Sequence, residues 1–304
     1  MRVAIAGSGS LAKYLAEELP TAGHEVVILT RSHKPFFDGL KGVSQCITDY
    51  SLSQLVEQID DCDAMICVIL DYTMAYTDVA LTLIEACTRS PKCKRFLPAE
   101  YGGNLEDYPD QPSFYYQNHE PVREALRNQQ EIEWTLVSVG WFADYLVPPS
   151  NRHLPDVDGL SVNLAAKIIT VPGTGKERFA ISSIRDVAQA IGQLLKVSTP
   201  WRPYVYMQGE ETSWLEITAF FKETTIPDLK VEFRSLTTLI DVIVKKNGEP
   251  EALAAEYDIF TVSGAGQFDQ DKVKRDRAEY FPTVHFRGLR ELAEAANRDH
   301  TAIV

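Results

Sequence analysis

The chain has 304 residues, 45% of them hydrophobic, which is enough to bury a full core in one large domain or two closely packed ones. Its formal net charge of -13 would repel a phosphate polymer, so nucleic-acid binding is not expected as the main activity. The five cysteines show no CxxC spacing and are typical of reduced thiols in a cytoplasmic protein. The longest apolar run, Ala64 to Leu70, is too short to cross a bilayer, and we expect neither a signal peptide nor a membrane partner.

The chain begins with an apolar strand, a glycine-rich turn and an amphipathic helix. The strand is predicted over Arg2 to Ala6, the turn reads Gly7-Ser8-Gly9-Ser10-Leu11-Ala12, and the helix covers Ser10 to Leu19. In such a GxGxxA pattern the first glycine permits a tight turn, and the second leaves room for a pyrophosphate against the backbone. The helix N-terminus then offers free N–H groups to the phosphates. The pattern therefore predicts a dinucleotide-binding turn, the alternative being a small-residue crossing that only packs.

Short apolar runs alternate with helical patterns through the first half of the chain. Strands rich in Val and Ile and separated by helices indicate a parallel sheet covered on both faces, which binds ligands at the carboxyl ends of its strands. The further strands are predicted at Glu25 to Thr30, Val43 to Ile47, Asp63 to Leu70, Lys94 to Leu97 and Glu133 to Val139, and the helices at Leu52 to Ile59, Tyr72 to Thr88 and Pro121 to Gln129.

The second half of the chain is less regular. We expect a strand at Lys167 to Val171, a turn at Pro172 to Gly175, a helix over Phe179 to Val197 and a strand at Tyr204 to Gln208. Later helices are predicted at Ser213 to Glu223, Leu236 to Lys246, Glu249 to Phe260, Asp269 to Tyr280 and Leu289 to Arg298, with a strand at Lys230 to Arg234 and turns at Asn247-Gly248 and Ser263 to Gly266.

These elements predict an α/β protein with a Rossmann-type doubly wound parallel sheet and a smaller, mostly helical C-terminal cap. The nucleotide-binding domain is expected in residues 1–150, with its sheet completed by parts of residues 166–210. Residues 211–304 are expected to form the substrate-binding cap.

The end of the second predicted strand indicates which nucleotide is bound. An acidic residue there would favour NAD, but the chain continues Arg31-Ser32-His33-Lys34 without an acid. Arg31 can place a planar fork on a 2′-phosphate and Ser32 can donate a hydroxyl. We therefore expect NADP(H), with ordinary solvated loop residues as the alternative interpretation.

Several motifs together resemble the NmrA-like and isoflavone-reductase-like atypical short-chain dehydrogenases, and most closely the members from fungal secondary metabolism. They are the glycine turn, Arg31, the stretches Lys94 to Gly102 and Glu133 to Leu146, and Pro172 to Gly175 followed by Asp186-Val187-Ala188. The resemblance implies an NADPH-dependent oxidoreductase that acts on a small aromatic or polyketide-like metabolite.

The resemblance also implies the residues of the site. Those implied to contact NADP(H) are Gly7, Ser8, Gly9, Ser10, Leu11, Arg31, Ser32, Val68, Ile69, Pro98, Ala99, Glu100, Tyr101 and Gly140. Trp141 and Phe142 would approach the nicotinamide and the substrate, unless they are plain core aromatics. His153, His285 and His300 show no metal-ligand spacing, so no metal site is expected.

The chain departs from the family pattern at the catalytic position. Reductases of this family carry a lysine four residues before an arginine, and here His119 stands four residues before Arg123. Tyr115 precedes His119 by four residues, which in a helix brings both side chains to one face. Histidine has an ordinary pKa near 6.5 and suits proton transfer more than fixed charge. Tyr115 and His119 are therefore the predicted catalytic residues, with a merely structural histidine as the alternative.

Three functions follow from these observations. The first is an NADPH-dependent reductase of a small molecule. The second is a non-redox isomerase, dehydratase or epimerase on the same fold, with His119 as acid and base. The third is an NmrA-type regulator that senses the dinucleotide and binds a protein partner without turnover. A monomer or a homodimer is expected.

Overall fold

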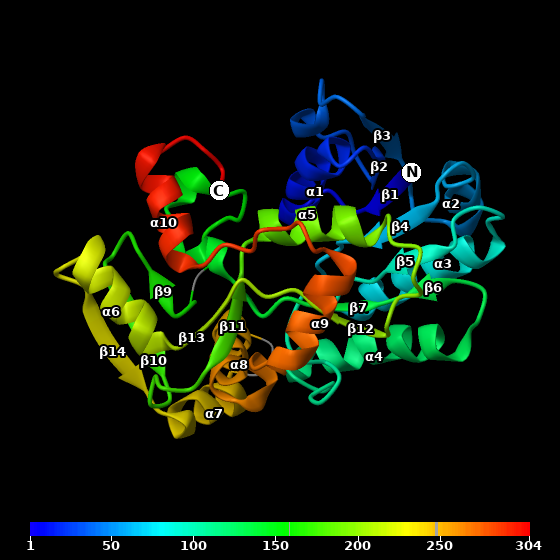
Figure 1. Ribbon diagram of the computed structural model, residues 1–304. Coiled ribbons are helices and arrows are strands. Elements are labelled where there is room, and N and C mark those ends of the chain that lie inside the picture. Colours follow the sequence, from blue (N-terminus) through cyan, green and yellow to red (C-terminus); the bar gives the residue numbers. More distant parts are fainter. Residues whose placement is uncertain (158, 247–248) are drawn as a thin grey trace.

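The computed structural model describes residues 1–157, 159–246 and 249–304. Its centre is a parallel sheet in the strand order β3-β2-β1-β4-β5-β6, and the order reverses between β1 and β4 (Figure 1). The strands are β1 (Arg2–Ala6), β2 (Glu25–Thr30), β3 (Val43–Ile47), β4 (Ala64–Cys67), β5 (Arg95–Leu97) and β6 (Glu133–Trp134). The predicted Rossmann-type sheet is confirmed.

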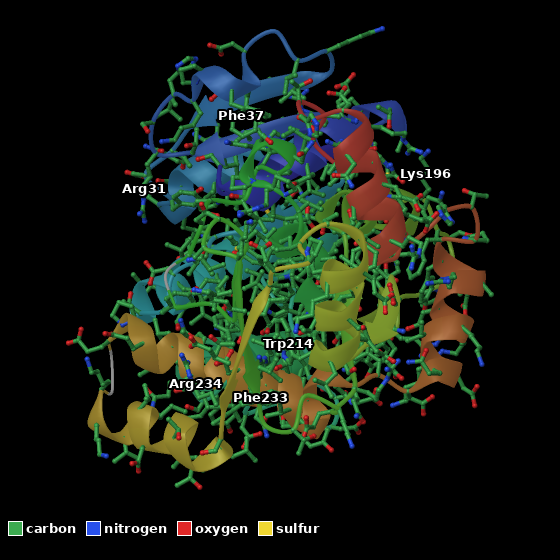
Figure 2. All side chains as sticks on the ribbon, turned by 90° about the vertical axis from the view of Figure 1, so that its left-hand side faces the viewer. Arg31, Phe37, Lys196, Trp214, Phe233 and Arg234 are labelled. Carbon is green, nitrogen blue, oxygen red and sulfur yellow. The ribbon has the colours of Figure 1, made fainter. Side chains whose placement is uncertain are left out.

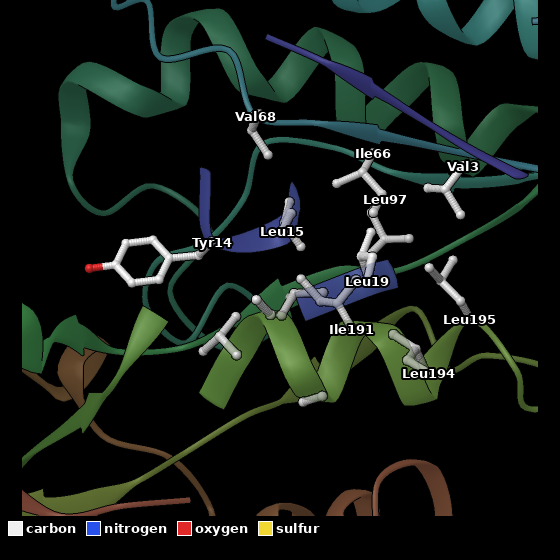
Figure 3. Close-up of a cluster of buried hydrophobic side chains, with 14 of the residues drawn as sticks. Val3, Tyr14, Leu15, Leu19, Ile66, Val68, Leu97, Ile191, Leu194 and Leu195 are labelled. Atoms are coloured by element: carbon white, nitrogen blue, oxygen red, sulfur yellow. The ribbon is translucent and has the colours of Figure 1, made fainter. Parts of the chain in front are cut away.

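Helices cover both faces of this sheet, as the two-sided apolar strands predict. On one face α1 (Ser10–Thr21) packs against α5 (Ile184–Leu194), and on the other lie α2 (Leu52–Gln58), α3 (Met74–Arg89) and α4 (Ser113–Asn128). Figure 3 shows Leu15 and Leu19 of α1 among Ile191 and Leu194 of α5 and the strand residues Ile66 and Leu97. Each fully buried side chain of this kind contributes roughly 1.5–3 kcal/mol, so this layer fixes α1 and the turn before it on the sheet.

The last strand of the sheet changes neighbours partway along. β6 pairs with β5, and after Thr135 the chain continues as β7 (Leu136–Ser138), which pairs in parallel with β12 (Tyr204–Tyr206). β12 thus pairs with the continuation of the last strand, in a two-stranded sheet with β7, and the expectation that it completes the large sheet stays a prediction. The strand predicted at Lys167 to Val171 lies in another sheet, because β10 (Ile168–Pro172) pairs with β9 (Val162–Asn163) and β14 (Lys230–Arg234).

Two helix predictions need correction. The segment predicted as one helix from Phe179 begins as a strand, β11 (Phe179–Ser182), which pairs with β8 (Trp141–Phe142) and β13 (Glu210–Thr212). Helix α4 begins at Ser113, eight residues before the predicted start at Pro121. Proline favours the first turn of a helix, which misplaced the start, whereas Pro121 lies inside this helix.

The remaining elements form a smaller, mainly helical unit around Trp141, Phe179 and Trp214. Its helices are α6 (Trp214–Thr224), α7 (Leu236–Lys245), α8 (Pro250–Val262) and α10 (Leu289–Arg298), whereas α9 (Gln270–Tyr280) packs on β12 and α5. The domain limits at residues 150 and 211 stay predictions, and the turn predicted at Asn247-Gly248 lies outside the described residues. Among the described residues, no helix has the length and apolar character needed to cross a membrane.

Candidate functional site

The glycine turn after β1 leaves the N-terminus of α1 open. Gly7 has a φ of 109°, and a Cβ there would lie 3.2 Å from backbone atoms of Val68 and Ile69, so this tight position favours glycine. Gly9 precedes the first residue of α1, and a Cβ placed on it would meet no atom within 4 Å. Among the described residues, no side chain caps α1, so its first N–H groups are left without a capping partner beside this open space. The turn has the geometry of an anion site.

The two serines of the turn point to either side of it. The hydroxyl of Ser8 lies 3.1 Å from the hydroxyl of Thr30 at the end of β2. Ser10 donates to the carbonyl of His153 at 3.1 Å, which ties the start of α1 to the segment after β8. Leu11 is half-buried against the core beneath α1. These contacts hold the turn in place without filling the space in front of Gly9.

Arg31 follows β2 directly and is exposed at the edge of the molecule, as Figure 2 shows. Its guanidinium lies 5.5 Å from the centre of the Tyr50 ring, and among the described residues it forms no hydrogen bond or ion pair. Tyr50 is itself fixed, because its hydroxyl donates to the carbonyl of Leu29 at 2.7 Å. Ser32, the neighbouring predicted ligand, is also exposed. The positively charged guanidinium of Arg31 is thus held beside the turn, and its N–H groups are not used by any described residue.

The loop after β5 carries four of the predicted cofactor residues, Pro98 to Tyr101, and is tied to the end of β7. The backbone N–H groups of Val139 and Gly140 both donate to the carbonyl of Gly102 at 2.9 Å. Gly140 has a φ of 74°, and a Cβ there would lie 2.2 Å from the carbonyl oxygen of Ala180. This glycine therefore allows β11 to pass close by, which is a packing reason for its presence.

Glu100 and Arg123 form a buried ion pair behind this loop. Arg123 donates from Nε to Oε1 at 2.7 Å and from its terminal nitrogen to Oε2 at 2.8 Å, and both side chains are 3% exposed. Burial acts to lower the pKa of Arg123, but the Glu100 carboxylate outweighs it and raises that pKa overall. Because both carboxylate oxygens are engaged, Glu100 would reach a cofactor through its backbone.

His119 lies on α4 beneath the same loop and is only 2% exposed. Its Nδ1 is 2.7 Å from Oδ1 of Asn118 and its Nε2 is 3.3 Å from the carbonyl of Ala99. The amide nitrogen of Asn118 donates to the carbonyls of Asp71 and Thr73, so Oδ1 is left to accept from the imidazole. Burial lowers the pKa of His119, which favours the neutral ring with its proton on Nδ1.

Tyr115 shares a face of α4 with His119, as the four-residue spacing predicts. The two rings meet edge to face at 4.7 Å, and Tyr76 stacks on the imidazole at 4.2 Å. The hydroxyl of Tyr115 lies 3.1 Å from that of Tyr257 on α8, and its ring contacts Tyr72 and Phe114. Burial raises the pKa of Tyr115, so its phenol stays protonated at neutral pH.

The cap also contacts the start of α4. The residue before α4 is Pro112, which cannot cap it, and the carboxylate of Glu256 accepts from the Ser113 hydroxyl at 2.8 Å and from the Phe114 N–H at 3.3 Å. Reasoning from the sequence missed Glu256 and Tyr257, because they lie more than 140 positions from these partners. It also missed Asn118, whose signal was its place directly before His119.

Trp141 and Phe142, predicted to face the substrate, have different surroundings. Trp141 is 6% exposed, and its ring packs on Tyr145 and Trp214 at 5.3 and 5.6 Å. It thus packs as a core aromatic of the smaller unit, which favours the alternative interpretation, and its contact with a substrate stays a prediction. Phe142 is half-buried against the core beneath α1 and α5, and its substrate contact stays a prediction.

Several buried hydroxyls have no hydrogen-bond partner among the described residues. They include those of Tyr101, after β5, and Ser138, at the end of β7. Buried polar groups without partners are uncommon and point to a missing ligand or water. Together with the open turn at Gly9 and the free Arg31, they fit a bound dinucleotide. In the part of the chain that the structure describes, no three His, Cys, Asp or Glu side chains are grouped so that they could hold a metal ion.

Comparison with known proteins agrees with this geometry. The profile of the NmrA-like family matches residues 2–291. Oxidoreductase swnR of Arthroderma benhamiae is 47% identical over 293 residues, covering 96% of this chain and 96% of the relative. Oxidoreductase swnR of Metarhizium robertsii is 43% identical over 293 residues, with the same 96% of both chains covered.

Solved structures share the fold at lower identity. The binary complex of leucoanthocyanidin reductase with NADPH from Vitis vinifera has a TM-score of 0.77 at 17% identity, and covers 96% of this chain and 97% of that chain. The resemblance inferred from the motifs is thereby confirmed, and the sequence relatives extend it along nearly the whole chain. The chain therefore belongs to the NmrA-like family and is related to its oxidoreductases.

Proposed function

We propose that this protein is an NADPH-dependent reductase of a small organic molecule. The observation that carries the proposal is the open N-terminus of α1 at Gly9, with the guanidinium of Arg31, which pairs with no described residue, at the end of the adjacent strand β2. The diphosphate would lie on the N–H groups of α1, and Arg31 and Ser32 would take the 2′-phosphate. The names of the sequence relatives, both oxidoreductases, support the same class of reaction.

The nicotinamide would lie beside the loop from Pro98 to Tyr101. NADPH supplies the hydride when bound, and the protein must then stabilise the negative charge that develops on the substrate. The Tyr115 phenol is the candidate proton donor, because its raised pKa keeps it protonated and its hydroxyl lies at the contact between α4 and the cap.

His119 is better suited to a positioning role than to direct contact with the substrate. It is buried, its Nδ1 proton is taken by Asn118, and the Tyr115 ring packs against it. It therefore packs beneath the cofactor loop at Ala99 and supports the Tyr115 ring. This revises the prediction that His119 itself transfers the proton.

An apolar or aromatic substrate fits the surroundings of Tyr115. Tyr72 and Phe114 contact its ring. Leu70 and Met74, which flank Tyr72 in the sequence, have side chains that are 69% and 52% exposed. Apolar side chains exposed beside a polar donor are typical of small-molecule sites. This arrangement supports an aromatic or polyketide-like metabolite as the substrate class.

The experiment is a substrate screen followed at the NADPH absorbance, combined with variants of α4. We expect Tyr115→Phe to lower kcat on the order of 10²-fold with unchanged NADPH affinity, while the exposed neighbour variant Tyr116→Phe leaves both unchanged. For His119→Ala we expect a lower kcat and weaker NADPH binding together, because the cofactor loop at Ala99 loses the ring that packs beneath it.

The outcomes separate the candidate functions. A loss of kcat alone in His119→Ala would return the imidazole to a direct proton-transfer role. Product formed at constant NADPH absorbance would indicate an isomerase, dehydratase or epimerase instead. Tight dinucleotide binding without turnover of any compound would indicate a regulator. Calorimetry showing no binding of NADPH or NADH would contradict the whole proposal.

A further inference from the structure

Strand β14 has a free edge on the outside of the molecule. It is the terminal strand of the small sheet β14-β10-β9, and among the described residues no strand pairs with its other side. Figure 1 shows β14 at the outer left, and Figure 2 faces that side, with Phe233 and Arg234 labelled on it. Phe233 is 62% exposed. An edge of this kind is a template for pairing with another strand.

The register with β10 identifies the free backbone groups. Lys230 donates its N–H to the carbonyl of Lys167, and the carbonyl of Arg234 accepts from Gly173. In a parallel pair, alternate residues bond to the same neighbour, so residues 230, 232 and 234 face β10. Residues 229, 231 and 233 point their groups outward. The Leu229 N–H is already used by the carbonyl of Ile226 at 3.0 Å, which leaves the N–H groups of Val231 and Phe233 and three carbonyls.

The sequence along this edge is complementary to itself. It reads Asp228-Leu229-Lys230-Val231-Glu232-Phe233-Arg234. An antiparallel copy centred on Val231 places Leu229 opposite Phe233 of the partner subunit, Lys230 opposite Glu232 of the partner subunit, and Asp228 opposite Arg234 of the partner subunit. The hydrogen-bonded positions of this register are residues 229, 231 and 233, the same residues whose backbone groups point outward.

The side chains agree with this register on both faces of the strand. Leu229 and Val231 belong to or pack on the core beneath α6, so the apolar pairs fall on that face. The charged pairs fall on the opposite face of the strand. Asp228 and Arg234 already have partners in Lys167 and Asp258, at 2.8 and 3.3 Å. Lys230 and Glu232 are exposed and form no ion pair among the described residues, so their pairing across the axis carries the charge complementarity.

We infer that the free edge of β14 is the interface of a two-fold symmetric homodimer, in which two β14 strands pair antiparallel about Val231. Four backbone hydrogen bonds form, two between the Val231 residues and two from the Phe233 N–H groups to the Leu229 carbonyls. Two short strands bury less than the roughly 1,600 Å² of a standard interface. The exposed row Leu236, Ile240 and Val244 on α7, which begins two residues after β14, supplies further apolar surface at this end of the molecule.

The test is a charge exchange across the axis, measured by sedimentation velocity over a range of protein concentrations. Lys230→Glu sets two glutamates opposite one another twice in the dimer, and we expect the dissociation constant to rise on the order of 10-fold. Glu232→Lys should do the same, and the double variant Lys230→Glu/Glu232→Lys should restore the original value. The exposed Lys41→Glu, in the loop before β3, is the control for a charge reversal elsewhere and should leave association unchanged.

A second measurement locates the contact. Val231→Cys places the two new thiols opposite each other at a Cα separation of about 5.5 Å, within disulfide range, so mild oxidation should crosslink the dimer. A protein that stays monomeric up to about 100 µM would overturn the inference, as would a dimer that neither responds to Lys230→Glu nor crosslinks through residue 231. Because the edge is formed by the smaller unit, these outcomes do not depend on whether NADPH is bound or consumed.

Discussion

At the scale of single residues, the value of Arg31 as a phosphate ligand comes from its surroundings. Most arginines of this protein are engaged in ion pairs, as Arg123 is with Glu100, whereas Arg31 is held over Tyr50 without a carboxylate partner among the described residues. A guanidinium that has no internal partner loses little when it binds a phosphate, because no existing ion pair must break. Discrimination between the two pyridine coenzymes should therefore depend on this side chain.

Replacing Arg31 with glutamate should abolish the preference for NADPH. We expect the affinity for NADPH to fall about 10- to 100-fold, the range for losing a hydrogen bond to a charged group, while NADH binding is changed much less. Calorimetric titration with both coenzymes measures this, and Lys41→Glu controls for the general change in charge. An Arg31→Glu protein that still prefers NADPH would show that the 2′-phosphate is bound elsewhere.

At the scale of elements, the strand ends that form the site are held by close backbone packing. The loop after β5 is hydrogen-bonded through the carbonyl of Gly102 to the segment that follows β7. This segment includes Gly140, which lies against the carbonyl of Ala180 in β11. This chain of contacts links the large sheet to the smaller unit. Its weakest point for substitution is Gly140, since both its φ and the neighbouring backbone exclude a side chain.

Gly140→Ala should destabilise the protein strongly. A Cβ 2.2 Å from a backbone oxygen forces β7 and β11 apart, and the positive φ adds strain, so we expect a loss of about 3 kcal/mol in the free energy of unfolding. Gly23→Ala is the matched control, because Gly23 has a φ of 82° with no atom within 4 Å of a Cβ, and should lose only about 1–2 kcal/mol. Urea unfolding measures both, and equal losses would contradict the packing argument.

How far the sequence predicts these elements depends on the range of the interactions. Local patterns placed β1, β2, β3, β14 and α10 at their observed bounds, because alternating or periodic apolar residues suffice there. The pairing of β10 with β14 joins segments 62 positions apart and has no local signal. The early start of α4 depends on contacts with Glu256 and Tyr257, which outweigh the helix-start signal of Pro121.

In the candidate site, too, the features with a local sequence pattern could be predicted and those that depend on distant contacts could not. The turn geometry of Gly7 and Gly9 follows from the glycine pattern, and the shared face of Tyr115 and His119 follows from their spacing. The burial of His119 could not be foreseen, since it depends on Tyr76 of α3 and on the loop at Ala99. Trp141 likewise reads as a cleft residue from the sequence and lies in a core because Trp214 packs on it.

At the scale of the whole molecule, the response to pH includes contributions from two buried carboxyl groups, Asp144 and Asp258, and from the buried His119. Burial raises the pKa of Asp144 and of Asp258 to about 6, although each accepts hydrogen bonds. Between pH about 4 and 6 the folded protein then holds protons that the unfolded chain has lost, so stability falls as pH rises through this range. Burial lowers the pKa of His119, which acts oppositely, removing stability as the pH falls below about 6.5.

Asp258→Asn should flatten the fall in stability between pH 4 and 6. The amide cannot ionise, so a contribution of up to about 3 kcal/mol to the pH dependence disappears, while the Ser161 hydroxyl still has an oxygen to donate to. Urea unfolding at a series of pH values measures the slope. The exposed Asp271→Asn serves as the control, and an Asp258→Asn protein with the original slope would contradict the assignment.

The hydrogen bonds that the Glu256 carboxylate accepts from the first turn of α4 have a practical consequence for engineering. Grafting a foreign C-terminal portion onto the nucleotide-binding half, in order to change specificity, would strip α4 of its cap and Tyr115 of its hydroxyl neighbour at the same time. A functional chimaera must therefore inherit residues 250–266 and residues 102–116 from the same parent, whatever joint is chosen elsewhere.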